Sequence, residues 1–439
     1  MPTITAVDAV DVRFPSAQAR PGRRPTHPDA EHSVAYVAIW TDTGLAGHGL
    51  AFTIGRDNPA CVALARRVAT ALMGRDVDDV AASLGPTYRR LVEAGRRDAG
   101  TALARLATTA VLTAVWDLVA RHAEKPLWRL VSEMEPAELV AACDFGQLSD
   151  ALPGREALEM LERLAPSRAQ RLRHLAQVGY PAYATLPAPP GHTDAQVRAS
   201  YETAATDGWH AVKVETGGTF GHAKRRIAAA RAALGPDTTL LVDARHGWDV
   251  SEAVQHGTEL AEFGPLWIDA PTDPDDVVGH ASIRAALSAV GVATGGGCHS
   301  RGTVKRMVEA HAVDYCPIDP GWSVSVNEVV PVLLLAAKFG VRVCYPGSGV
   351  GLSELVQHIA MIDFICVSGS MVGRLIEHVD VLHQHFTSPA VIDRGWYRLP
   401  ADPGYSTRMH SESLATYRYP DGARWRQVAS PQPRPSRTG

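Results

Sequence analysis

Three short apolar runs between residues 211 and 271 decide the fold: Ala211-Val-Lys-Val-Glu215, Leu240-Leu-Val-Asp243-Ala-Arg245 and Leu266-Trp-Ile-Asp269-Ala-Pro271. A helical pattern separates each run from the next, over about 223–234 and 250–263. Alternating strands and helices are typical of a parallel α/β sheet. Each run ends in charged residues, and a β/α barrel keeps its chemistry at the carboxyl ends of its strands.

The same alternation extends on both sides of these runs and predicts a closed barrel. Five more strands are expected at Tyr180–Thr185, Val290–Thr294, Tyr315–Asp319, Val341–Tyr345 and Phe364–Ser368, which makes eight with the central three. Upstream, a strand over 2–14 and a hairpin within 34–52 precede helical patterns at 59–72, 78–93, 100–123 and 126–130. Strands followed by helices indicate an α+β domain that ends near residue 140.

Composition limits the function classes. The 439 residues are 46% hydrophobic and 21% charged, with a formal net charge of −4, which gives no sign of a nucleic-acid or anionic-membrane partner. No apolar run approaches the roughly 20 residues of a membrane span. The N-terminus lacks the regions of a signal peptide, and the six cysteines contain no CxxC pair. We therefore expect a cytoplasmic protein without a disulfide framework or thiolate zinc site.

Many separate motifs fall in one order along the chain. They include Trp116-Asp-Leu118, Lys125-Pro-Leu-Trp128, Val326-Asn-Glu328, Gly349-Val-Gly-Leu352 and Glu354-Leu-Val-Gln-His358. In this the chain resembles the L-fuconate dehydratase branch of the acid-sugar dehydratases in the enolase superfamily. The resemblance implies an enolase-type α+β N-terminal capping domain and a modified TIM-like (β/α)7β barrel. The expected divisions are 1–145 for the capping domain, 146–375 for the barrel, 376–420 for a segment returning to the capping domain, and 421–439 for a disordered tail.

In that family three strand-end carboxylates hold Mg²⁺, a Lys-x-Lys pair supplies a base, and a His–Asp dyad and a last-strand glutamate assist. Matching the motifs implies that Asp243 and Asp269 keep two metal positions, that the third falls at Gly296, and that Asp319 keeps the dyad aspartate. The second lysine becomes Glu215, the dyad histidine becomes Pro346, and the last-strand glutamate becomes Val372. We therefore expect that the ancestral reaction is lost.

Each candidate residue has a plainer alternative. Lys213, Glu215 and Asp319 are the expected catalytic residues, but Lys213 and Glu215 would equally form a salt bridge, and Asp319 would equally bond a loop backbone. Arg245 is expected to lie across Asp243 and Asp269, because two close carboxylates without a cation repel each other, and extension into solvent is the alternative. The expected substrate-binding residues are Arg245, His246, Cys298, His299 and Tyr345, with a loop histidine as the alternative for His246.

Three functions follow from these residues. The first is a repurposed, metal-independent lyase or isomerase acting on a small polar molecule, expected to be a carboxylate. The second is a catalytically inactive homologue that binds a ligand or a partner protein, and the third is a surviving Mg²⁺-dependent acid-sugar dehydratase. We expect no cofactor, with weak Mg²⁺ binding at the vestigial pair Asp243 and Asp269 as the alternative, and we expect a homo-oligomer.

Overall fold

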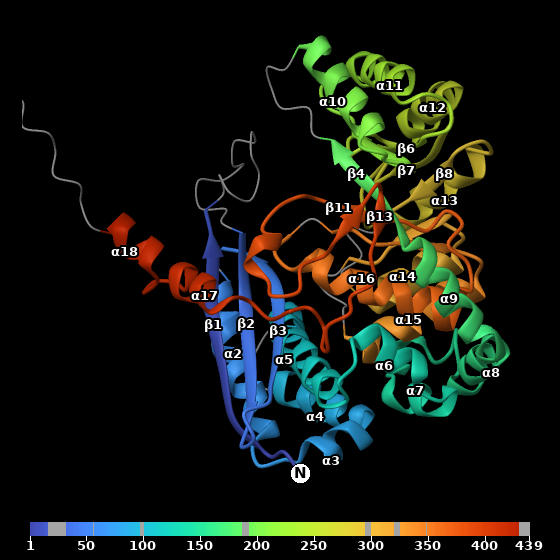
Figure 1. The fold of residues 1–439 in the computed structure, drawn as a ribbon. Coiled ribbons are helices and arrows are strands. Elements are labelled where there is room, and N and C mark those ends of the chain that lie inside the picture. The colour runs from blue at the N-terminus through green and yellow to red at the C-terminus, as the bar shows by residue number, and fades with distance from the viewer. Residues whose placement is uncertain are drawn as a thin grey trace, which may run out of the picture.

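The computed structural model describes residues 1–15, 32–55, 57–96, 101–186, 193–294, 300–319, 325–347 and 349–429. A three-stranded sheet with its helices stands beside a β/α barrel (Figure 1). The predicted loop at 16–32, apart from its last residue, lies outside the described residues. So do the glycines 295–297, Cys298, His299 and the predicted disordered end at 430–439.

The N-terminal domain has the expected strands and helices. Its antiparallel sheet contains β1 (Ile4–Phe14), β2 (His32–Thr41) and β3 (Ala46–Ile54). Its helices are α2 (Asn58–Ala69), α3 (Val77–Ala82), α4 (Leu84–Arg96), α5 (Thr101–His122), α6 (Leu127–Glu133) and α7 (Pro136–Ala142). Helix α5 lies directly on β3, because a Cβ at Gly47 or Gly49 would stand 2.4 or 2.3 Å from a carbonyl oxygen of α5.

One expected helix of this domain is two helices. The pattern over 78–93 breaks at Ser83, where α3 ends and α4 begins at Leu84. Pro86 explains the break, because proline is tolerated in the first turn of a helix but not in its interior. Helix α5 also corrects the expectation about apolar runs, since Ala102–His122 is long and apolar enough to span a membrane. However, 78% of its most apolar window is buried inside the protein, as in a core helix.

The barrel consists of eight parallel strands in a closed ring. The strands are β4 (Tyr180–Leu186), β5 (Ala211–Glu215), β6 (Thr239–Asp243), β7 (Pro265–Asp269), β8 (Gly291–Ala293), β9 (Tyr315–Pro317), β10 (Arg342–Cys344) and β11 (Ile376–His378). The helices between them are α10 (Asp194–Thr206), α11 (Phe220–Leu234), α12 (Val250–Leu260), α13 (Val277–Ala286), α14 (Arg301–Glu309), α15 (Val326–Lys338) and α16 (Leu352–Ile362). Strand β11 closes the ring by pairing with β4, and its Glu377 amide donates to the Tyr345 carbonyl at 2.8 Å.

The eighth strand is not where the sequence placed it. The segment Phe364–Ser368 belongs to a π-helix, η5 (Asp363–Ser368), which continues α16. Its apolar residues are buried, and a short buried apolar run cannot be told from a strand by its periodicity. The true last strand, β11, lies beyond residue 375, which was the expected end of the barrel.

Alternation along the strands divides the barrel core from its outer layer. Large side chains fill the inside of the ring, and they are Tyr183, Leu241, Trp267, Tyr315, Cys344 and Leu375. The residues between them point outward onto the surrounding helices, and these include Val212, Leu240, Val242 and Ile268. The side chains two residues beyond this filled inner layer therefore face the mouth of the barrel.

The chain after β11 returns to the N-terminal sheet (Figure 1). It contains β12 (Ile392–Asp393), β13 (Trp396–Tyr397), α17 (Ser411–Tyr417) and α18 (Ala423–Ala429). The Tyr419 amide donates to the Asp11 carbonyl at 2.8 Å, and the Arg13 guanidinium lies 3.7 Å from the centre of the Tyr419 ring. Because α18 is helical, the expectation of disorder over 421–439 is wrong for this part.

Two further helices, α8 (Gly154–Leu164) and α9 (Arg168–Val178), connect the N-terminal domain to β4.

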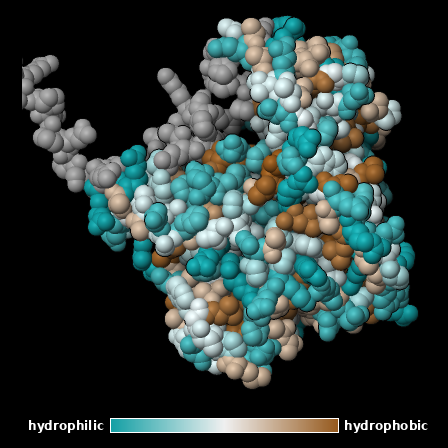
Figure 2. All heavy atoms as spheres, viewed as in Figure 1, coloured by the Kyte–Doolittle hydropathy of each residue, from teal (hydrophilic) through white to brown (hydrophobic). Residues whose placement is uncertain are grey.

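On the face shown in Figure 2, apolar residues form separate patches among hydrophilic ones. Among the barrel residues that the structure describes, the most exposed of the large apolar side chains are Val278 and Val372, at 76% and 73%.

Candidate active site

Charged residues from neighbouring strands meet at the mouth of the barrel. Glu215, Asp243 and Asp269 are register partners at the ends of β5, β6 and β7, so their backbones lie side by side. Lys213 faces the same interior two residues earlier in β5. The sequence prediction that these strand ends bring their charges together is therefore consistent with the pairing of the strands.

Lys213 lies at the centre of this group. Its Nζ is 3.1 Å from Glu377 Oε1 and 3.9 Å from Asp243 Oδ2, and it lies 5.3 Å from the centre of the Tyr183 ring. Burial lowers the pKa of Lys213, but Glu377, Tyr183, Asp243 and Asp269 oppose this and raise the pKa well above its usual value. Lys213 is therefore a fixed cation enclosed by acidic groups.

Glu377, from β11, is the partner that the sequence prediction missed. Its Oε1 accepts from the Thr185 hydroxyl, and its Oε2 accepts from the Gly347 amide at 3.1 Å. Glycine is needed at 347, because a Cβ there would stand 2.5 Å from the Glu377 carbonyl oxygen. Burial raises the pKa of Glu377, but Lys213 and the hydrogen bonds from Thr185 and Gly347 hold it below its usual value.

The sequence contained a signal for Glu377. Leu375-Ile-Glu377 repeats the pattern of two apolar residues and an acid seen in Leu241-Val-Asp243 and Trp267-Ile-Asp269. Misplacing the eighth strand assigned the last-strand position to Val372, which precedes β11 and is 73% exposed. The inference that the last strand had lost its glutamate is therefore wrong.

Glu215 and Arg245 form a pair at the outer side of the mouth. Arg245 Nη1 lies 3.4 Å from Glu215 Oε2, and the two side chains are 49% and 19% exposed. This differs from the expectation that Arg245 lies across Asp243 and Asp269, because only its backbone amide reaches Asp243, donating to Oδ1 at 2.9 Å. The Lys213–Glu215 salt bridge that was the plainer alternative is not the arrangement described: Lys213 pairs with Glu377 and Glu215 with Arg245.

Left-handed turns at the strand ends explain where Arg245 points. Arg245 and His246 both have φ of 57°, and Ala270, after β7, has φ of 50°. Such conformations cost a non-glycine residue of order 1–3 kcal/mol, and they are common at functional sites.

His246 Nδ1 lies 2.9 Å from the Thr272 carbonyl oxygen. This contact supports the loop-histidine alternative over substrate binding.

Asp269 is the least satisfied acid of the group. In the described part of the chain its Oδ1 is buried and has no hydrogen-bond partner. Burial, and next the repulsion of Asp243, raise the pKa of Asp269 to about 7, although Lys213 opposes the shift. Protonation of this carboxyl group relieves its repulsion from Asp243.

The remaining candidates divide between the mouth and the outer layer. Asp319 is half-buried and follows β9 by two residues, on the same face of the chain as Tyr315 inside the ring. Tyr345 is not at the mouth: it is fully buried, and its ring centre lies 6.4 Å from that of Tyr180. Cys344 points into the ring, so the next side chain points outward, and the substrate-binding prediction for Tyr345 is wrong.

Two family models match the sequence. The mandelate racemase / muconate lactonizing enzyme N-terminal domain matches residues 7–132, and the enolase C-terminal domain-like model matches residues 196–413.

The full-length comparisons agree. Mitochondrial enolase superfamily member 1 of Xenopus laevis is 43% identical over 432 residues, which are 97% of each chain. L-galactonate dehydratase of Hypocrea jecorina is 38% identical over 433 residues, which are 96% of each chain. The crystal structure of human mitochondrial enolase superfamily member 1 superposes with a TM-score of 0.91 at 40% identity, covering 98% of this chain and 99% of that one. None of the three is named an L-fuconate dehydratase, so that narrower resemblance stays a prediction. The chain belongs to the enolase superfamily, with an acid-sugar dehydratase among its relatives, and its predicted capping domain and (β/α)7β barrel are confirmed.

Proposed function

We propose that this protein is a metal-independent lyase or isomerase that moves a proton on a small hydroxy acid. The observation that carries the proposal is the buried Lys213 ammonium, held 3.1 Å from Glu377 and 3.9 Å from Asp243 at the mouth. A fixed ammonium attracts the carboxylate of a substrate and stabilises negative charge that develops next to it. Lys213 stands at the first position of the family's Lys-x-Lys pair, and its charge does not depend on a bound metal ion.

The acids present do not fit the family's metal site. Asp243 and Asp269 supply two strand-end carboxylates, and the third aligned position is Gly296, which has no side chain. In the described ranges no group of three or more His, Cys, Asp or Glu side chains is placed to hold a metal ion. Mg²⁺ demands near-octahedral oxygen coordination, and the Lys213 ammonium 3.9 Å from Asp243 competes for one of the two carboxylates.

The proposed proton acceptor is Glu215. Its carboxylate lies at the mouth with 19% of its side chain exposed, and Arg245, its partner at 3.4 Å, is positioned to hold an anionic group beside it. Asp319 follows β9, four strands further round the ring, and would serve the opposite face of a substrate. A carboxylate base, two cations and a second acid suit proton transfer, elimination or rearrangement.

The relatives support the class of substrate. L-galactonate dehydratase, which by its name acts on a sugar acid, is 38% identical over 96% of this chain. The same relative favours a second candidate, Mg²⁺-dependent dehydration of an acid sugar, as does the glutamate that β11 keeps at 377.

Exchange of the α-proton for deuterium in D₂O, followed by NMR over a panel of acid sugars, tests the proposal. We expect wild-type protein treated with a chelator to catalyse exchange on at least one panel member. Removing a general base costs about 10²–10⁴-fold in rate, so Glu215→Gln should lose exchange by that factor. Glu202→Gln, at an exposed position of α10, is the matched control and should exchange like wild type.

Two results would reject the proposal. Turnover to a 2-keto acid that appears only with Mg²⁺ would establish the second candidate instead. Absence of exchange and turnover across the panel, with and without Mg²⁺, would favour the inactive, ligand-binding homologue.

A further inference from the structure

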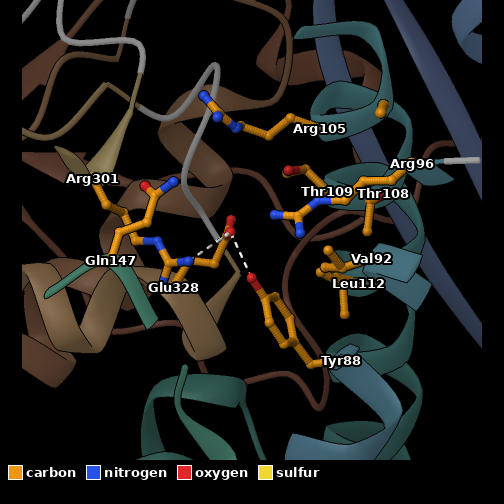
Figure 3. Close-up of a pocket in the computed structure, with 11 residues that line it drawn as sticks. Tyr88, Val92, Arg96, Arg105, Thr108, Thr109, Leu112, Gln147, Arg301 and Glu328 are labelled. Atoms are coloured by element: carbon orange, nitrogen blue, oxygen red, sulfur yellow. Dashed lines mark hydrogen bonds and ion pairs between the residues drawn. The ribbon is translucent and has the colours of Figure 1, made fainter. Parts of the chain in front are cut away.

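A second cavity lies between the capping domain and the barrel, and it shares no residue with the candidate active site. Its volume is about 170 Å³. Helices α4 and α5 form one wall, and the first turns of α14 and α15 form the other (Figure 3). The lining combines polar and apolar surface, and the residues are Tyr88, Val92, Arg96, Ala104, Arg105, Thr108, Thr109, Leu112, Gln147, Arg301 and Glu328.

Positive charge dominates this lining, with three arginines against one glutamate. Glu328 is already engaged, because the Tyr88 hydroxyl donates to its Oε1 at 2.8 Å and Arg301 lies 3.9 Å away. Arg301 is fixed on its other side by Asp144, at 2.7 Å. The acid of the lining is thus already paired, and it does not offset the positive charge of Arg96.

Arg96 points its guanidinium into the cavity (Figure 3). Within the described part of the chain it makes no hydrogen bond or ion pair, although it stands at the end of α4 beside the closely packed Gly95. A Cβ at Gly95 would lie 2.5 Å from Thr108 Oγ1, so the glycine brings α4 against α5 and places Arg96 near the two threonines. Donors without a partner are therefore gathered on this wall.

Thr108 and Thr109 add hydroxyl groups to the same wall. Both residues are buried, 4% and 2% exposed, and no hydrogen bond from either hydroxyl is formed with any residue that the structure describes. Neither hydroxyl oxygen is among the fully buried polar atoms that lack a partner, so each is accessible from the cavity that these residues line. A ligand in the cavity that accepts hydrogen bonds would give these hydroxyls a partner.

The cavity is accessible and of limited size. A neighbouring hollow of about 490 Å³ shares Tyr88, Val92 and Arg96 with it and leads to the surface. A cavity of about 150 Å³ is large enough for benzene, so the space here suits a molecule of about five to eight non-hydrogen atoms. Guanidinium groups match the oxygens of carboxylates and phosphates in geometry and charge.

We propose that this cavity binds a compact dianion, either a phosphate group or a short dicarboxylate, between Arg96, Arg105 and Arg301. The hydroxyls of Thr108 and Thr109 donate to it from the α5 wall. The site joins the two domains, so its ligand contacts helices of both. The inference does not depend on which reaction occurs at the barrel mouth.

Isothermal titration calorimetry of the full-length protein tests the proposal, with inorganic phosphate and succinate as separate probes at constant ionic strength. We expect at least one probe to bind, and the probe that binds identifies the source of the dianion. Arg96→Gln should weaken binding about tenfold or more, because it removes a charged hydrogen-bond donor. Thr109→Val, which keeps the side-chain shape, should weaken it by a smaller factor.

Arg155→Gln is the matched control, because the Arg155 side chain is 90% exposed on α8, and its affinity should equal that of wild type. Circular dichroism of each variant without ligand checks its folding. The proposal is overturned if neither probe binds wild type, or if folded Arg96→Gln and Thr109→Val both bind with unchanged affinity.

Discussion

Replacing Lys213 by methionine should destabilise the protein strongly, because it leaves Glu377 buried without its counter-charge. The Glu377 side chain is 3% exposed, and Lys213 Nζ is 3.1 Å from its carboxylate. The Thr185 hydroxyl and the Gly347 amide remain as neutral donors. Breaking a buried ion pair from one side typically costs about 3–5 kcal/mol, and we expect a loss of this size in the free energy of unfolding.

The pH dependence of this loss follows from the pKa of Glu377. In wild type the pKa lies below the ordinary 4.5, so the ion pair stabilises the protein above about pH 4.5, and this stabilisation is lost as the pH falls through the native pKa. In Lys213→Met, burial without the ammonium raises the pKa instead, so the variant is more stable when Glu377 is protonated. The difference between wild type and variant should therefore shrink toward pH 4.5.

Urea denaturation at pH 7.5 and pH 5 measures both effects. The double variant Lys213→Met/Glu377→Gln is the control, since a neutral amide in place of the carboxylate should recover most of the lost stability. A single variant that loses less than about 1 kcal/mol would refute the reasoning, because it would place the pair among solvent-screened surface ion pairs. A double variant no more stable than the single one would refute it as well.

Two further predictions concern other parts of the molecule. His383 Nδ1 lies 2.6 Å from buried Glu354; although burial lowers its pKa, Glu354 raises it from 6.5 to about 8. The raised pKa contributes about 2 kcal/mol of stability that is fully present below pH 6.5 and lost as the pH rises through 8. In urea denaturation across this range, the difference in unfolding free energy between wild type and His383→Gln should fall accordingly. A difference that stays constant with pH would exclude the linkage. We also expect a homo-oligomer, in which contacts cover exposed apolar residues such as Val278 and Val372; light scattering that gives the mass of a single chain at working concentration would contradict this.

Much of the fold could be predicted because the barrel strands share one local pattern. Runs such as Leu241-Val-Asp243 and Trp267-Ile-Asp269 are short, apolar and followed by an acid, so they identify strand and mouth together. The segment 364–368 lacks the acid. It is mostly apolar because it is buried, and its composition therefore resembles that of a strand, although it forms a π-helix. Leu375-Ile-Glu377 has the full pattern, and following it consistently would have found both β11 and Glu377.

The details of the site depend on geometry that residue types do not specify. Arg245 follows a metal-position aspartate in sequence, but a left-handed turn directs its side chain to Glu215. Tyr345 directly follows a strand whose last residue faces the interior, so alternation sends it outward. The partner of Lys213 lies 164 residues along the chain, and only closure of the ring by β11 and β4 brings it close.

Calorimetric titration of the purified protein with Mg²⁺ tests most directly the claim that the mouth works without a metal ion. Two aligned carboxylates and the competing Lys213 ammonium, 3.9 Å from Asp243, should leave no tight site. We predict no saturable heat at micromolar Mg²⁺ for wild type at pH 7.5. A saturable isotherm with micromolar affinity that Asp243→Asn abolishes would contradict the account and make Mg²⁺-dependent dehydration the better assignment.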